Sequence, residues 1–245
     1  MRSLSNPRFH PAWAVAVGAA AAFVAGCGPS GGTSISTVTD TDGGGGDVLI
    51  TSGPYQPLVV GATWSYHVND KGVKYDKVAV FETQEDLGGP KAGTSGFRMK
   101  ETFPANTQLT WYSQVGDVVA RMHEQSMDAN NQPKSEDWYD PYRLRVDASA
   151  DHLKSGASWD WNYSDTHTSR TKPTATVSLT EHWKVDGINE PVTVPAGTFA
   201  SLRLTHIDPS DGSTKTYWFV KGVGKAREET SAGHIEELAS YQNTQ

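Results

Sequence analysis

Gly61-Ala62-Thr63-Trp64-Ser65-Tyr66-His67-Val68 alternates large apolar side chains with polar ones from Trp64 onward. Successive side chains of a β-strand point to opposite faces, so this period of two predicts a strand with Trp64, Tyr66 and Val68 on one face. The Gly-Ala pair in front of it is typical of a turn. The stretch therefore predicts the opening strand of a β domain.

The same alternation recurs further along the chain. It is found in the runs Val78-Ala79-Val80-Phe81, Val177-Ser178-Leu179-Thr180 and Leu202-Arg203-Leu204-Thr205-His206-Ile207. Turn residues separate such runs, as at Asp186-Gly187 and Pro195-Ala196-Gly197, and we find no long amphipathic helix. We expect a mainly β fold with little helix: a single antiparallel sheet, either curled or forming a half-open barrel.

Two motifs occur twice, in the same order. Gly61 to Tyr66 recurs as Gly156-Ala157-Ser158-Trp159-Asp160-Trp161, and Thr110-Trp111-Tyr112 recurs as Thr216-Tyr217-Trp218. Two copies are too few, and their spacing too long, for a solenoid. The pattern instead predicts two duplicated strand sets in one sheet, with Trp64 and Trp159 in equivalent, buried strands.

Three short elements resemble a loose group of uncharacterised bacterial lipoproteins. They are Gly61-Ala62-Thr63-Trp64-Ser65-Tyr66, Val194-Pro195-Ala196-Gly197-Thr198-Phe199 and Tyr217-Trp218-Phe219-Val220-Lys221-Gly222-Val223-Gly224. The resemblance implies one β domain, similar in type to the half-open barrels of periplasmic lipoprotein carriers. It implies no catalytic residue.

The N-terminus carries a second resemblance. Arg2 and Arg8 precede the apolar run Ala12–Val24, which is shorter than the roughly 20 residues that span a bilayer. Val24-Ala25-Gly26-Cys27 then resembles the lipobox of bacterial lipoproteins, and Cys27 is the only cysteine of the chain.

The lipobox resemblance implies a signal peptide over residues 1–26, cleavage before Cys27, and lipidation of Cys27 by diacylglycerol and an amide-linked chain such as palmitate. Two or three acyl chains hold a protein stably at a membrane. Gly28 stands where lipoproteins retained at the inner membrane often have Asp. We therefore expect a lipid anchor in the cell envelope, at the outer membrane.

The rest of the chain divides into two segments. Residues 28–53 are mostly Gly, Ser, Thr and Asp, the composition of a flexible linker. The predicted organisation is a signal peptide (1–26), the lipidated cysteine with its linker (27–53), and an antiparallel β domain (54–245).

Charge and cysteine content limit the function. The net charge is −7, and the leader removes two arginines and no acid, so the mature chain is more acidic still. Such a chain without a basic cluster does not suit nucleic acid. With its only cysteine acylated, the domain has no disulfide and folds on its core alone.

The sequence holds no recognisable catalytic or metal-binding motif. Its histidines lack zinc spacing, no G-x-S-x-G elbow occurs, and no cofactor is expected. The most distinctive polar and aromatic run is Glu136-Asp137-Trp138-Tyr139-Asp140-Pro141-Tyr142. We interpret it as a loop between the two strand sets. Trp138, Tyr139 and Tyr142 are the candidate residues for ligand or partner contact.

Three functional hypotheses remain open. The first is a non-enzymatic envelope module that serves in structure or in binding an envelope protein. The second is a carrier or binder of a lipid or other apolar molecule in the concave face of the sheet. The third is a hydrolase with an unfamiliar site. A face filled by the protein's own Trp and Tyr favours the first hypothesis, a continuous apolar cavity the second, and convergent carboxylate and His side chains the third.

Overall fold

The computed structural model describes residues 36–38, 48–208 and 212–243, and it is almost entirely β. Cys27, the predicted lipidation site, and the predicted signal peptide lie outside the described residues. The elements are β1 (Ser36–Val38), β2 (Val48–Ile50), β3 (Thr63–Asp70), β4 (Val73–Asp86), the 3-10 turn η1 (Gly89–Lys91), β5 (Ser95–Thr102), β6 (Thr107–Val115), β7 (Val118–Met127), β8 (Pro133–Asp147), β9 (Ser158–Ser169), β10 (Lys172–Val194), β11 (Gly197–Ile207), β12 (Thr214–Val220), β13 (Gly224–Thr230) and β14 (His234–Gln242).

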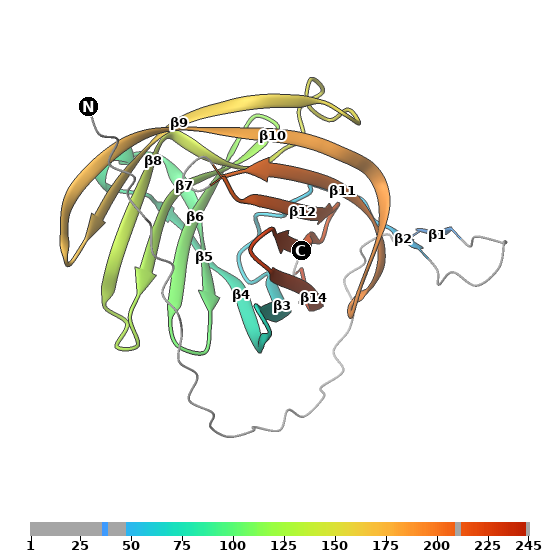
Figure 1. Cartoon of the computed structure of the whole chain (residues 1–245), viewed down its shortest axis with the longest axis horizontal. Helices are drawn as coiled ribbons and strands as arrows, with labels where there is room; N and C mark the ends of the chain where they lie inside the picture. Colours follow the sequence, from blue (N-terminus) through green and yellow to red (C-terminus); the bar gives the residue numbers. More distant parts are fainter. Residues whose placement is uncertain (1–35, 39–47, 209–211, 244–245) are drawn as a thin grey trace. The chain divides into compact units, whose positions relative to one another are not determined.

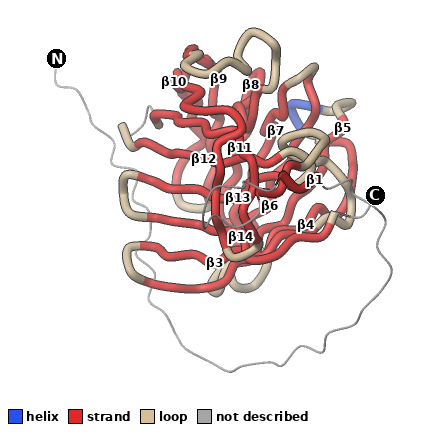
Figure 2. The backbone as a smooth tube through the Cα atoms, turned by 90° about the vertical axis from the view of Figure 1, so that its right-hand side faces the viewer, coloured by secondary structure: helices blue, strands red, loops and turns tan. Residues whose placement is uncertain are grey.

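Strands β3 to β14 form a closed, antiparallel barrel of 12 strands (Figure 1). Each strand pairs with the next one along the chain, as the succession of hairpins in Figure 2 illustrates. The ring closes where the last strand meets the first, with His234 opposite Asp70 and Gln242 opposite Thr63. An even number of strands allows the two ends of such a meander to pair antiparallel.

The expectation of a mainly β, antiparallel sheet is confirmed, but the expectation of a curled sheet or half-open barrel is wrong. Pairing β14 with β3 removes the two exposed edges that a half-open sheet would leave, and satisfies their backbone hydrogen-bonding groups. Local alternation predicts strands, but it carries no signal for which distant strands meet.

The repeated motifs occupy corresponding strands. The Gly-Ala copies precede β3 and β9, which each begin a series of six strands, and the second pair lies in β6 and β12. Gly61 N–H donates to Phe81 O, and Gly156 N–H donates to Val185 O, both at 2.8 Å. The two series thus begin with the same backbone contact.

Strand β3 has the predicted buried face. Trp64, Tyr66 and Val68 are 1%, 4% and 2% exposed. The Trp64 indole donates to Val223 O at 2.5 Å and meets the Phe81 ring edge-on at 5.6 Å. Trp159 differs from the prediction, because it is only partly buried and stacks on His152 at 4.0 Å.

A short segment before β3 packs against the C-terminal strands. In β2, Leu49 aligns with Phe199 of β11, the Thr51 hydroxyl donates to Lys221 O, and Gly222 N–H donates to Pro54 O at 2.8 Å. Gly222 has φ +70°, and a Cβ there would collide with Ser52 O, so glycine suits both backbone and space. Some of these contacts come from residues that the sequence analysis placed in the linker.

Candidate functional site

The predicted contact residues lie in strand β8. Trp138, Tyr139 and Asp140 pair with Thr166, Asp165 and Ser164 of β9, so the expectation of a loop between strand sets is wrong. The Asp-Pro pair suggested a turn, but pairing of β8 with both neighbours fixes an extended backbone. Trp138 and Tyr139 consequently face opposite sides of the sheet, and Tyr139 is only 3% exposed.

Trp138 belongs to an aromatic stack formed across three neighbouring strands. Trp111 of β6, His123 of β7 and Trp138 of β8 are aligned in register. The His123 ring lies 4.3 Å from Trp111 and 3.8 Å from Trp138, and nearly parallel to the latter. Burial lowers the pKa of His123, although its contact with Glu136 at 2.8 Å acts in the opposite direction. The neutral imidazole is therefore favoured between the two indoles.

The connection between β4 and β5 covers this aromatic stack. Leu87 packs with Trp111, whose indole donates to Glu85 Oε1 at 2.8 Å. A Cβ on Gly89 would lie 2.9 Å from the Trp138 ring, so the backbone approaches the indole closely. Tyr142 instead stacks on Trp161 at 4.6 Å. Trp138 and Tyr142 both pack against the cluster of Leu87, Trp111, Ala120 and Met122, whereas Tyr139 is buried against Tyr163.

Replacing Trp138 with Ala should lower the free energy of unfolding by about 1–3 kcal/mol, because it removes a ring that stacks on His123 and supports the β4–β5 connection. Urea denaturation of the variant measures this loss. Val115→Ala, at an exposed strand end, is the control and should cost under about 0.5 kcal/mol. Equal costs for the two variants would contradict a packed role for Trp138.

The barrel lumen contains an ionic network, which we call the lysine–glutamate network: Lys77, Lys225, Glu236, Glu228 and Glu101. Both lysines contact Glu236 Oε2 at 2.6 Å, and both are at most 5% exposed at the side chain. Lys77 also contacts Glu101 at 2.9 Å, and Lys225 contacts Glu228. These groups come from four different strands, so the network joins β4, β5, β13 and β14.

The lysines hold their carboxylate partners ionised. Burial alone would raise the pKa of Glu236, but Lys225 and Lys77 outweigh it and hold that pKa well below the ordinary value. Burial opposes ionisation of Glu228 too, and Lys225 nonetheless lowers its pKa to about 2. Burial would lower the pKa of Lys77, but Glu101 and Glu236 raise it. The network is therefore fully charged at neutral pH.

Arginines cross the same lumen. The Arg145 guanidinium of β8 lies 5.6 Å from the Tyr217 ring and 5.1 Å from the Phe219 ring, both on β12. It also lies 6.0 Å from the Tyr112 ring of β6. Strands β8 and β12 are not neighbours, so this side chain bridges the interior. Arg143 reaches Glu181, which is fully buried, at 2.7 Å.

Sequence reasoning missed these lumen charges, although a signal was present. Lys77 shares its strand face with Ala79 and Phe81, and Glu236 shares its face with Leu238. A charge at an apolar position of the alternation predicts a buried ion that needs a partner. What the sequence could not supply is the partner, because Lys77 and Glu236 are 159 residues apart.

Histidine–carboxylate pairs are the other recurrent polar feature. Among the described residues, five join neighbouring strands: His67–Asp76, His123–Glu136, His167–Asp137 and His182–Asp160 at 2.6–2.8 Å, and His234–Asp70 at 3.6 Å. Burial raises the pKa of Asp137 to about 6 despite the His167 contact, and Asp165 adds to the rise. These pairs are spread around the barrel. They therefore cross-link strands and do not converge on one cleft.

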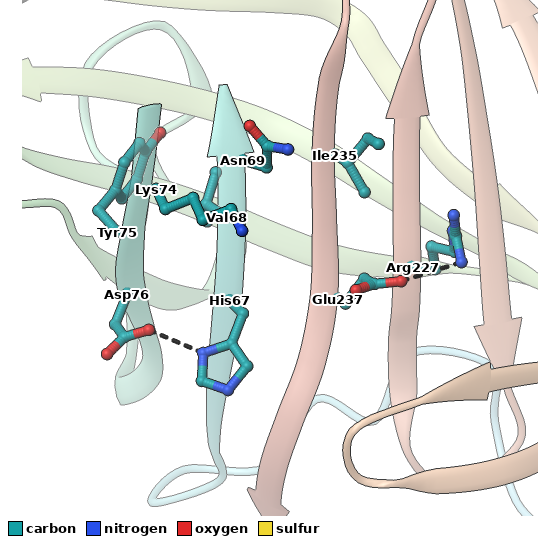
Figure 3. Close-up of a pocket in the computed structure, with 9 residues that line it drawn as sticks. All are labelled: His67, Val68, Asn69, Lys74, Tyr75, Asp76, Arg227, Ile235 and Glu237. Atoms are coloured by element: carbon teal, nitrogen blue, oxygen red, sulfur yellow. Dashed lines mark hydrogen bonds and ion pairs between the residues drawn. The ribbon is translucent and has the colours of Figure 1, made fainter. Parts of the chain in front are cut away.

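A groove of ≈ 560 Å³ lies across strands β13, β14, β3 and β4 (Figure 3). Its charged side chains are largely matched to one another: His67 contacts Asp76 at 2.8 Å, and Arg227 contacts Glu237 at 2.9 Å (Figure 3). His67 and Asp76 are 59% and 78% exposed, so this is a solvated surface and not an enclosed pocket. Within the described part of the chain, no group of three or more His, Cys, Asp or Glu side chains could hold a metal ion.

Comparisons with known proteins do not assign the chain to a family. No protein-family model matches the chain, and no curated protein matches it significantly. A solved structure with a similar arrangement is a Bacteroides fragilis protein, inferred to be exported, with a YmcC-like fold. The two are 13% identical with a TM-score of 0.44, and the match covers 78% of this chain and all of that one. No helix among the described residues is long and apolar enough to cross a bilayer.

Proposed function

We propose that this protein is a lipid-anchored, non-enzymatic module of the bacterial cell envelope, at the outer membrane, which serves in structure or in binding a partner through its outer surface. The anchor is Cys27 in its lipobox-like sequence. The proposal excludes nucleic acid as a partner because the chain is acidic and lacks a basic cluster.

The observation that supports a structural or binding role is the content of the lumen. Large aromatic side chains fill it, with Trp64, Phe81, Phe219 and Tyr112 at most 2% exposed. The lysine–glutamate network and Arg145 occupy it too. An apolar ligand would have to displace these rings and strip partners from buried charges, which is costly. Binding through the outside of the barrel has no such cost.

We expect Cys27→Ser to release the protein from membranes or to leave an uncleaved precursor. The thioether-linked lipid requires the cysteine sulfur, and each buried CH₂ contributes about 0.8 kcal/mol to anchoring. Membrane fractionation and intact-mass spectrometry measure both effects. The wild-type chain should begin at Cys27 and carry acyl chains. A mature chain with an unmodified Cys27 would contradict the proposal.

The second candidate function is a carrier of a lipid or other apolar molecule, and it rests on the barrel architecture alone. Native mass spectrometry of the detergent-extracted protein separates the two. A non-covalent lipid present in stoichiometric amount, retained after exchange into a second detergent, would favour the carrier. A mass equal to the chain plus its covalent acyl groups would favour the structural or binding module.

A further inference from the structure

Strand β10 extends beyond the barrel wall. Its 23 residues form the long strand that arcs across Figure 1. Residues 182–194 pair with β11 on one side, whereas residues 172–181 pair with β9 only. Among the strands that the structure describes, none pairs with the other edge of 172–181. We call this segment the β10 edge.

The β10 edge lacks the usual protection against strand pairing. Between Lys172 and Glu181 it reads Pro-Thr-Ala-Thr-Val-Ser-Leu-Thr, with no charge. Residues 172–178 are all exposed, including Val177 at 40%. Soluble proteins normally place charges, bulges or covering loops at such edges, because the unpaired backbone groups can pair with another strand. Here Pro173 and the irregular register between Lys172 and Ala175 protect only one end, and residues 175–180 have neither a charge nor a bulge.

The side chains of the β10 edge divide by face. Ala175, Val177 and Leu179 lie on one face, and Thr174, Thr176, Ser178 and Thr180 lie on the other. The hydroxyls of the second face already form hydrogen bonds with hydroxyls of β9: Thr176 contacts Thr166 at 2.9 Å, and Thr174 contacts Thr168 at 3.0 Å. An added strand that also has apolar side chains on one face and hydroxyls on the other would continue both faces of the sheet.

We propose that the β10 edge is a self-association site, at which two copies of this chain pair antiparallel about a two-fold axis. In the register centred on Val177, that residue opposes its own copy and Ala175 opposes Leu179. On the other face, Thr176 opposes Ser178 and Thr174 opposes Thr180. Apolar side chains then meet apolar ones, and hydroxyls meet hydroxyls, without any like-charged pair.

A second copy fits this edge for two reasons. A two-fold interface must be self-complementary. In the register centred on Val177, each side chain opposes one from the same face of the other copy, so both faces meet this requirement. Cross-strand pairs of β-branched or hydroxyl residues are themselves stabilising. Confinement of anchored copies to one membrane would favour the encounter, but the pairing itself does not depend on the lipid.

Co-capture of two differently tagged full-length chains, co-expressed and extracted in detergent, tests this site. The wild-type chains should co-purify. Val177→Lys in both chains should reduce co-capture about tenfold or more, because two ammonium groups would then oppose each other at the two-fold axis. Val177→Glu in both chains should do the same. Combining a Val177→Lys chain with a Val177→Glu chain should restore co-capture.

Val78→Lys is the matched control. Val78 is a strand valine that is 42% exposed, but both edges of its strand are already paired, with β3 and β5. This variant should co-purify like the wild type. Wild-type chains that do not co-purify would overturn the proposal. So would an equal loss with Val78→Lys, or a failure of the Lys/Glu combination to restore co-capture.

Discussion

Glu236→Gln should lower the free energy of unfolding by about 3 kcal/mol or more, since it leaves two buried lysines without their shared carboxylate. Lys77 and Lys225 both contact Glu236 at 2.6 Å. Breaking a buried ion pair from one side typically costs ~3–5 kcal/mol. The lower part of that range applies because Lys77 retains Glu101 and Lys225 retains Glu228. Urea denaturation at neutral pH measures the loss.

An exposed ion pair provides the control for this prediction. His67 and Asp76 are 59% and 78% exposed, so Asp76→Asn should cost at most about 1 kcal/mol. If Glu236→Gln lowered the free energy of unfolding no more than Asp76→Asn, the lysine–glutamate network would contribute little to stability, which would contradict this prediction.

The same network should make stability fall with acid. Glu228 has a folded pKa of about 2 against an ordinary value of 4.5, and the pKa of Glu236 is also depressed. A carboxyl with a lower pKa in the folded state stabilises the protein above its unfolded pKa, and this contribution is lost as the pH falls through the folded value. The free energy of unfolding should therefore fall below pH 4.5, toward pH 2. Glu236→Gln should show a shallower fall, because one of the titrating groups is gone.

Trp64→Ala should cost about 3–5 kcal/mol, as expected for removal of a fully buried aromatic ring. The substitution leaves a cavity beside Phe81 and removes the hydrogen bond to Val223 O. That loss is a large part of the ~5–15 kcal/mol that holds a typical domain together. Thermal unfolding followed by circular dichroism measures it. If the Ala variant does not fold, Trp64→Phe should fold with a smaller loss.

Trp159 is the matched comparison, because it holds the corresponding position in the second copy of the motif. It is only partly buried, so Trp159→Ala should cost about 1–2 kcal/mol. A loss equal to that of Trp64→Ala would mean that the two positions are equivalent in burial as well as in sequence. A smaller loss for Trp64→Ala than for Trp159→Ala would place the core elsewhere.

Local sequence rules predicted strands well and their partners poorly. The alternation at Trp64, Tyr66 and Val68 identified a real buried face, because side-chain direction along a strand depends only on the local backbone. Local rules predict a loop for the charged and aromatic run at residues 136–142, because polar residues and Pro favour turns when considered alone. Pairing of β8 with β7 and β9 overrode that preference.

The amino-acid sequence alone was enough to predict the β class, the strands with a clear alternation, the paired Gly-Ala-Thr/Ser-Trp motifs and the lipobox-like N-terminus. Each of these depends on residues close together in the chain. Closure of the barrel through β14 and β3, the partners of the lumen charges and the exposed edge of β10 are visible only in the folded chain. These depend on pairings between residues far apart, whose geometry is set when the ring closes and not by any local preference.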